Sequence, residues 1–234
     1  MLTWLDPDDD TEPFPALNSA LKEPDGLLAA GGSLSPQRLL SAYRCGIFPW
    51  FENGQPILWW SPNPRMVLKP KDVHISRSLK KVINNNQYSC TFDKAFSDVI
   101  LACSATREGQ NGTWITASMI HAYETLFTLG HAHSIEVWSA DKLVGGLYGI
   151  AIGQVFFGES MFSLQSNASK VGFAYLCRQL NEWNYQLIDC QVHSEHLESL
   201  GATTISRGDF AQQLDLYCLQ NTSKKAWVAD ANTF

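Results

Sequence analysis

The stretch LVGGLYGIAIGQVFFG, residues 143–158, decides the fold that we expect for this chain. It holds five glycines and Gln154 within 16 residues, and Glu159 follows it directly. A membrane-spanning helix needs about 20 predominantly apolar residues, so this stretch is too short and too rich in glycine to be one. We interpret it as two buried strands, 143–152 and 154–158, that turn at Gly153.

Helices and further strands are predicted on both sides of this pair. Before it, the sequence predicts strands at 57–60, 66–69 and 134–139 and helices at 76–83, 93–104 (capped by Asp93) and 116–129. After it, the sequence predicts a helix at 167–183, a buried strand at 186–191 and short helices near 194–200 and 208–219. This order of elements, with helices before a strand meander and a helix and a strand after it, indicates an α+β protein. In such a protein helices flank a mixed sheet.

The first third of the chain is expected to form a separate unit. Residues 1–34 are rich in proline and look irregular. Ser35-Pro36 then begins a helix with a hydroxyl cap followed by proline, and Gly46 ends it. The segment Ser61-Pro-Asn-Pro64 is a turn or linker. We therefore predict a small N-terminal domain over 1–63 and a larger domain over 64–234.

The net charge of −6 is unevenly distributed over the 234 residues. Residues 1–25 alone carry −6, whereas residues 65–81 hold six bases against Asp72 and carry +5. Such a patch could bind a polyanion, although a solvated face is the more common meaning of a charge run. Six cysteines without a C-x-x-C motif favour reduced thiols and a cytoplasmic protein. An acidic N-terminus without an apolar run predicts no signal peptide.

Two segments place polar groups beside apolar runs. In IDCQ, residues 188–191, strand alternation puts Asp189 and Gln191 on one face, where an acid and an amide could bind an ammonium and a carbonyl side by side. The alternative is a solvated strand end. Glu159 stands at the end of the most apolar run, where a carboxylate is costly unless it is paired or hydrated. That position favours a cleft over a core.

Common nucleotide, metal and hydrolase motifs are absent from the sequence: it contains no G-x-x-x-x-G-K-[ST], no H-E-x-x-H and no G-x-S-x-G. Cys190, His193 and His196 could be imagined as metal ligands, but no second cluster matches them, so we predict no metal. A Cys–His nucleophile pair has no local sequence to support it.

Seven strings spread along the chain resemble the leucyl/phenylalanyl-tRNA–protein transferase family: EPDGLLA (23–29), GIFPWF (46–51), WWSP (59–62), GTWIT (112–116), HAHSIEVW (131–138), GESMFS (158–163) and IDCQ (188–191). The resemblance runs from about Phe14 to about Trp227. It implies a small N-terminal domain and a C-terminal domain like the GNAT acetyltransferase fold. It also implies transfer of Leu or Phe, less often Met, from aminoacyl-tRNA to the α-amine of proteins that begin with Arg or Lys, which marks them for degradation.

The resemblance also implies roles for individual residues. Asp189 and Gln191 form the catalytic pair: Asp189 holds the incoming amine and relays its proton, and Gln191 positions the amine or the carbonyl. Glu159 orders that network or meets the basic side chain of the acceptor. An apolar pocket for the donor side chain corresponds to Leu147, Phe156, Met161, Leu176 and Ile188. Trp50 and Trp114 correspond to the aromatic positions that stack on the terminal adenine, and Arg77, Lys80 and Lys81 lie under the acceptor stem.

Two rival functions remain open. The first is an acyl-CoA N-acetyltransferase on the same fold, but residues 161–168 (MFSLQSNA) lack the glycines of a CoA pyrophosphate turn, so no cofactor is expected. The second is a non-catalytic protein that binds tRNA ends or peptide N-termini. The sequence also departs from the family pattern: Ser33 stands where an acid is expected, and Asn84-Asn-Asn86 where further bases are expected, which would weaken tRNA binding.

Overall fold

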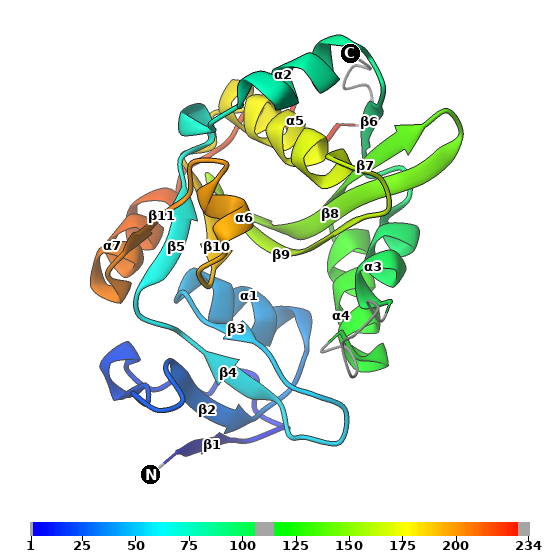
Figure 1. Ribbon diagram of the computed structural model, residues 1–234. Coiled ribbons are helices and arrows are strands. Elements are labelled where there is room, and N and C mark those ends of the chain that lie inside the picture. The colour runs from blue at the N-terminus through cyan, green and yellow to red at the C-terminus, as the bar shows by residue number, and fades with distance from the viewer. Residues whose placement is uncertain (1, 106–114, 229–234) are drawn as a thin grey trace.

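The computed structural model describes residues 2–105 and 115–228 (Figure 1). The strands are β1 (Thr3–Leu5), β2 (Leu27–Gly31), β3 (Phe48–Pro49), β4 (Leu58–Trp60), β5 (Arg65–Leu68), β6 (Ser89–Phe92), β7 (Ala132–Ser139), β8 (Lys142–Ile152), β9 (Val155–Ser163), β10 (Leu187–Gln191) and β11 (Thr203–Ile205). The α-helices are α1 (Pro36–Arg44), α2 (Arg77–Asn84), α3 (Phe96–Ser104), α4 (Ala117–Thr128), α5 (Ala168–Glu182), α6 (Glu195–Glu198) and α7 (Arg207–Tyr217). Single 3₁₀ turns occur at Leu17–Ser19 and Pro70–Asp72.

The strands form two sheets. The smaller sheet has the order β1-β2-β4-β3, and the larger has the order β11-β5-β10-β9-β8-β7-β6. Within the larger sheet β10 runs parallel to β9, whereas the other neighbours pair antiparallel. The predicted α+β class with a larger mixed sheet is confirmed, and the structure adds a smaller sheet in the N-terminal part of the chain.

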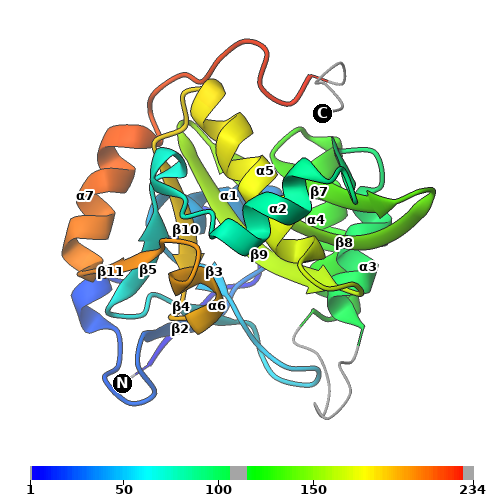
Figure 2. The same ribbon diagram turned by 45° about the horizontal axis from the view of Figure 1, so that its top comes forward.

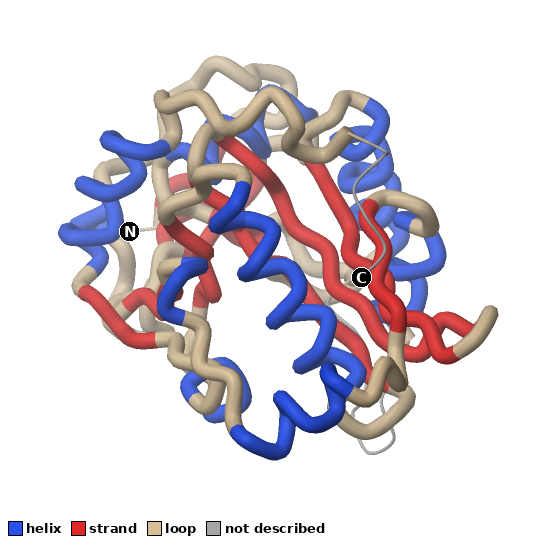
Figure 3. The backbone as a smooth tube through the Cα atoms, turned by 90° about the horizontal axis from the view of Figure 1, so that it is seen from above, coloured by secondary structure: helices blue, strands red, loops and turns tan. Residues whose placement is uncertain are grey.

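Helices cover both faces of the larger sheet, and two adjacent glycines of β8 show which helices lie where. A Cβ at Gly145 would lie 2.8 Å from Ala168 at the start of α5, and one at Gly146 would lie 3.2 Å from Val99 of α3. Because successive strand residues face opposite sides, α5 and α3 pack on opposite faces. Helix α2 lies beside α5, and α4 beside α3 (Figure 3). Figure 2 shows α7 beside the β11 edge.

The hydrophobic core continues from the smaller sheet into the larger one. Trp59 of β4 and Leu39 of α1 belong to the same buried cluster as Tyr148 of β8 and Phe157 of β9. The change of sheet falls between Trp60 and Arg65, next to the predicted domain boundary. The division of the chain into domains 1–63 and 64–234 stays a prediction.

Most predicted elements are confirmed. The predicted strand pair forms β8 and β9 with a turn at Gly153, whose φ of +54° suits glycine. The helix that begins after Ser35 is capped as expected, because the Ser35 hydroxyl accepts from the N–H of Arg38. No helix among the described residues is both long and apolar enough to cross a membrane.

Three local predictions are wrong, and the two edge strands of the larger sheet are missing from the prediction. Residues 1–34 are not irregular throughout, because β1 and β2 bury Leu5 and Leu28. The edge strands β6 and β11 were not predicted from their short, mixed sequences. Strand β9 does not end at Gly158 but continues to Ser163. Asp93 does not cap α3; the helix begins later, at Phe96, and the Asp93 carboxylate accepts from the backbone N–H of Ser134 instead.

Candidate active site

Two irregularities in adjacent strands bring the polar site residues together. In the pairing of β8 with β9, Gly149 faces Gly158 and Tyr148 faces Ser160, so Glu159 is an extra residue. In the pairing of β10 with β5, the register also shifts, between Asp189 and Gln191. Such bulges redirect side chains. Here the Gln191 Nε2 donates to Glu159 Oε1 at 2.7 Å, across the parallel pair of strands.

Strand alternation is therefore not what places Asp189 beside Gln191. Gln191 adopts a left-handed backbone conformation, with φ of +62°. In that conformation its backbone N–H donates to Asp189 Oδ1 at 2.9 Å. The two residues meet through a backbone contact rather than through parallel side chains.

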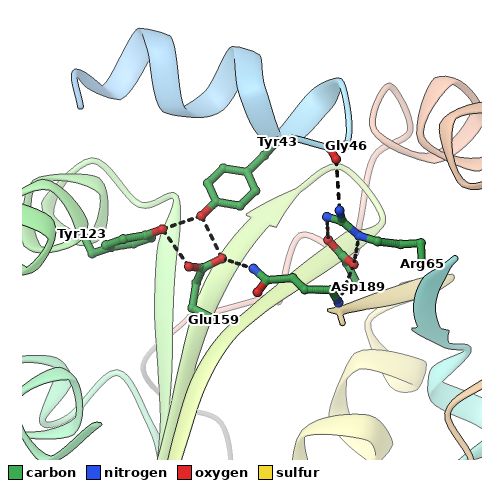
Figure 4. A network of polar contacts seen from close by, with 7 residues as sticks. Tyr43, Gly46, Arg65, Tyr123, Glu159 and Asp189 are labelled. Carbon is green, nitrogen blue, oxygen red and sulfur yellow. Dashed lines mark hydrogen bonds and ion pairs between the residues drawn. The ribbon is translucent and has the colours of Figure 1, made fainter. Parts of the chain in front are cut away.

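Two tyrosine hydroxyls hold the carboxylate of Glu159 from the other side (Figure 4). Tyr43 of α1 donates to Oε1 at 2.8 Å, and Tyr123 of α4 donates to Oε2 at 2.7 Å. The two hydroxyl oxygens lie 2.5 Å apart. Tyr43 belongs to the N-terminal part of the chain, so this part completes the site.

Burial controls the protonation of this cluster. It raises the pKa of Glu159 to about 7, against the opposing effect of the Tyr123 and Tyr43 hydroxyls. Burial, together with the nearby Glu159 charge, raises the pKa of both tyrosines well above 10. The tyrosines therefore remain hydrogen-bond donors, and Glu159 changes charge near neutral pH.

Asp189 is fully buried and paired with Arg65, so a solvated strand end is wrong. Arg65 Nε donates to Oδ1 at 2.8 Å and Nη2 donates to Oδ2 at 2.6 Å. The basic stretch 65–81 consequently loses one of its members, because Arg65 is 1% exposed and does not contribute to a surface patch. Both carboxylate oxygens of Asp189 already have partners inside the protein, which changes the role that we assign to it below.

A cavity of about 920 Å³ opens beside these residues, which confirms that Glu159 lies at a cleft. It is lined by Glu159, Asp189 and Gln191 and by all of the apolar positions expected for the donor side chain: Leu147, Phe156, Met161, Leu176 and Ile188. Phe173 also lines it and was missed, although it precedes Leu176 by three residues and so lies on the same face of α5.

The expected nucleic-acid contacts lie outside this cavity or outside the described residues. Trp50 is 43% exposed and its ring lies 5.5 Å from that of Trp60. Trp114 is outside the described residues. Arg77, Lys80 and Lys81 are exposed on α2. These roles stay predictions.

The imagined metal ligands do not assemble within residues 2–105 and 115–228, where no group of three or more His, Cys, Asp or Glu side chains could hold an ion. His193 instead lies 3.2 Å from Glu198 (Nε2 to Oε2). Cys190 is buried.

Sequence signals for three of these residues were weak or misleading. Nothing in the patterns around Tyr43 and Tyr123 marks them as polar site residues, because both stand at apolar positions of helices. In the sequence, Arg65 belongs to the basic stretch 65–81, which predicts a surface base. A basic residue at the start of a buried strand was the available signal for an internal ion pair.

Two family models match consecutive parts of the chain and define its class as a transferase. The model for "Leucyl/phenylalanyl-tRNA protein transferase" matches residues 67–215, and the model for the N-terminal domain of the same proteins matches residues 32–63. The chain belongs to the leucyl/phenylalanyl-tRNA–protein transferase family.

Named relatives cover nearly the full length. The leucyl/phenylalanyl-tRNA–protein transferase of Pseudomonas syringae pv. syringae is 59% identical, over 95% of this chain and 96% of the relative. That of Cellvibrio japonicus is 56% identical, over 92% and 90%. Among solved structures, a GCN5-related N-acetyltransferase from Kribbella flavida is similar with a TM-score of 0.38 and 10% identity, over 73% of this chain and 61% of that one. The family assignment comes from the sequence relatives.

Proposed function

We propose that this protein transfers Leu or Phe, and less often Met, from aminoacyl-tRNA to the α-amine of proteins that begin with Arg or Lys, and so marks them for degradation. The observation that carries the proposal is the Gln191 amide, held by Glu159 at the side of an apolar cavity. Family membership supports tRNA as donor and protein as acceptor. Because aminoacyl-tRNA is a cytoplasmic substrate, we propose a cytoplasmic site of action.

The orientation of the Gln191 amide supports a specific role in the transfer. Since Nε2 donates to Glu159, the amide oxygen remains to accept an N–H from the incoming α-amine. The amine nitrogen then attacks the ester carbonyl carbon of the donor, and the ester oxygen of the terminal ribose leaves with a proton. An aminoacyl ester is already activated, so holding the two reactants together supplies most of the effect, on the order of 7–11 kcal/mol.

Asp189 holds the backbone of Gln191 in place and does not contact the amine itself. Its carboxylate is buried, pairs with Arg65 and accepts the backbone N–H of Gln191. We propose that Asp189 is a positioning residue and that Gln191 is the catalytic residue that touches the amine. Glu159 orders the amide, which is one of the two roles expected for it.

The apolar part of the cavity supports selection of the donor side chain. Leu147, Phe156, Leu176 and Ile188 are each at most 3% exposed, and they form a compact apolar wall. Shape selection in such a pocket is worth about 1–3 kcal/mol per methylene. A branched Cβ would meet this wall sooner than the unbranched Cβ of Leu, Phe or Met.

The start of α5 argues against the acetyltransferase alternative. Phosphate groups bind at helix N-termini through free backbone N–H groups. Here the first-turn N–H of Ser169 donates to the Ser163 hydroxyl, and that of Ala168 donates to the Gln165 carbonyl. Both donors are already used inside the protein.

The proposed function is tested with labelled phenylalanyl-tRNA and two peptides that differ only in beginning with Arg or Asp. Transfer of label to the Arg peptide alone is expected. If neither peptide is labelled while the protein is folded and the tRNA is charged, the enzymatic proposal fails. Stoichiometric binding of CoA in a parallel titration would favour the acetyltransferase alternative.

A further inference from the structure

Arg65 lies where three parts of the molecule meet. It is the first residue of β5 and is almost fully buried. Its Cζ lies over two aromatic rings, 4.8 Å from the centroid of Phe48 in β3 and 4.7 Å from that of Phe210 in α7. These two cation–π contacts restrict the movement of the guanidinium.

Each of the three nitrogens of the same guanidinium donates a hydrogen bond (Figure 4). Two of its nitrogens grip Asp189 in a two-point contact, and Nη1 donates to the carbonyl of Gly46 at 3.2 Å. Gly46 has φ of +75°, and a Cβ there would lie 3.1 Å from the Phe210 ring. The planar fork of arginine matches a carboxylate in a way that a lysine ammonium does not.

The chain of contacts continues from Arg65 into the candidate active site. Asp189 Oδ1, which accepts from Arg65 Nε, also accepts the backbone N–H of Gln191. That hydrogen bond stabilises the left-handed backbone conformation of Gln191, in which its side-chain amide donates to Glu159. Arg65 itself is absent from the cavity lining, so it reaches the reacting groups only through Asp189 and Gln191.

We propose that Arg65 is a positioning residue for the transfer step: its clamped guanidinium orients the Asp189 carboxylate, which in turn holds Gln191 in its working conformation. This inference rests on the proposed function. It differs from a purely structural ion pair, because it requires that changes at Arg65 act on turnover through Gln191.

The test begins with Arg65→Lys, which keeps the charge and removes the two-point grip. Its kcat for transfer should fall about 10²-fold, because a displacement of about 1 Å in a reacting group has an effect of that size. Its KM for aminoacyl-tRNA should change by less than about twofold, since Arg65 does not contact the donor. Phe210→Leu removes one aromatic contact of Arg65 but keeps Arg65 itself, so its kcat should fall by a smaller factor, again with little change in KM. This variant replaces Arg65→Lys in the test if Arg65→Lys does not fold.

Arg38→Lys is the matched control. Arg38 is also fully buried, lies 5.1 Å from the centroid of the Phe14 ring and donates to the main-chain carbonyls of Asp9 and Glu12, away from the site. Its substitution should lower the melting temperature and leave kcat unchanged.

A double-mutant cycle on kcat separates positioning from stability. In the Gln191→Ala background, Arg65→Lys should cause no further loss, because the group on which it acts is gone. If the two losses multiply, or if Arg65→Lys retains the full kcat, the inference is overturned while the proposed function stands. If the unchanged protein transfers nothing, both fail.

Discussion

The side-chain amide of Gln191 and the carboxylate of Glu159 lie 2.7 Å apart (Nε2 to Oε1), although 32 residues separate them in the sequence. They meet because each of the parallel strands β9 and β10 carries an irregularity, in the middle of β9 at Glu159 and at the carboxyl end of β10 between Asp189 and Gln191. Regular pairing would direct these side chains by simple alternation, whereas the bulges turn them toward each other.

The first prediction concerns this amide. Gln191→Ala removes the proposed acceptor of the incoming amine, so the amine is no longer held in place and the transfer rate should fall about 10²-fold, the effect of displacing a reacting group by about 1 Å. Single-turnover transfer of labelled Phe to an Arg peptide measures it.

Gln154→Ala provides its control. Gln154 is also buried and its Nε2 donates to the Asn221 carbonyl at 2.9 Å, outside the cavity. It should lose stability without losing turnover. Equal losses of turnover in the two variants would show that the effect is one of folding.

The second prediction concerns the tyrosines. Their hydroxyls lower the pKa of Glu159, which is about 7, so Tyr43→Phe or Tyr123→Phe should raise that pKa. A protonated Glu159 donates a hydrogen itself, so the hydrogen bonds that order the Gln191 amide rearrange. The acid limb of the pH–rate profile should therefore move to higher pH in both variants.

Tyr185→Phe is the reference for this experiment. The Tyr185 hydroxyl is also buried and hydrogen-bonded, but its partner is Trp227 Nε1 at 2.7 Å. The acid limb of the pH–rate profile of Tyr185→Phe should coincide with that of the unchanged protein. If the acid limbs of Tyr43→Phe and Tyr123→Phe also coincide with it, Glu159 does not control the rate.

Much of the fold follows from local sequence. Periodicity predicts α1, α2, α4 and α5, since each has an apolar stripe, and the hydroxyls of Ser35, Ser76 and Thr116 cap the first three. The short strands β1, β6 and β11 do not follow from it, because three or four residues carry too little pattern and form strands only where a neighbour offers an edge. Asp93 is a further case: tertiary contacts with Ser134 and His133 outweigh its tendency to cap.

The site is predictable only in part, for a similar reason. Asp189, Gln191 and Glu159 stand out as polar groups at the ends of apolar runs. Tyr43 and Arg65 join them through tertiary contacts that span 116 and 124 residues of sequence. Such contacts depend on how the two sheets dock, and no local pattern encodes that docking.

The third prediction follows from the raised pKa of Glu159. Because this pKa rises from 4.5 to about 7 on folding, the folded state binds the proton more tightly than the unfolded state. The associated stability is fully present below pH 4.5 and is lost as the pH rises through 7. Between pH 5 and pH 8 the loss should be about 2–3 kcal/mol.

Urea unfolding of the unchanged protein and of Glu159→Gln at both pH values measures this loss. The variant lacks the titrating group, so the stability of the unchanged protein relative to the variant should decrease between pH 5 and pH 8. Parallel changes in the two proteins would contradict a pKa near neutrality.

The last prediction concerns the proposed tRNA contact on α2. Arg77, Lys80 and Lys81 are exposed there, so each can approach a phosphate without losing an internal partner seen among the described residues. Replacing any one of them by Ala should raise the Kd for aminoacyl-tRNA. It should also reduce the slope of log Kd against log salt by about 1, because each lost phosphate contact releases one counterion fewer.

Lys142→Ala is the comparison for these variants, because Lys142 is equally exposed but begins β8, on a different part of the surface. Its Kd and its salt slope should match those of the unchanged protein. Saturating tRNA should restore the kcat of the three α2 variants, since their side chains do not line the cavity. An unchanged salt slope in all three would mean that the tRNA body binds elsewhere, and that the basic stretch 69–81 is a solvated face.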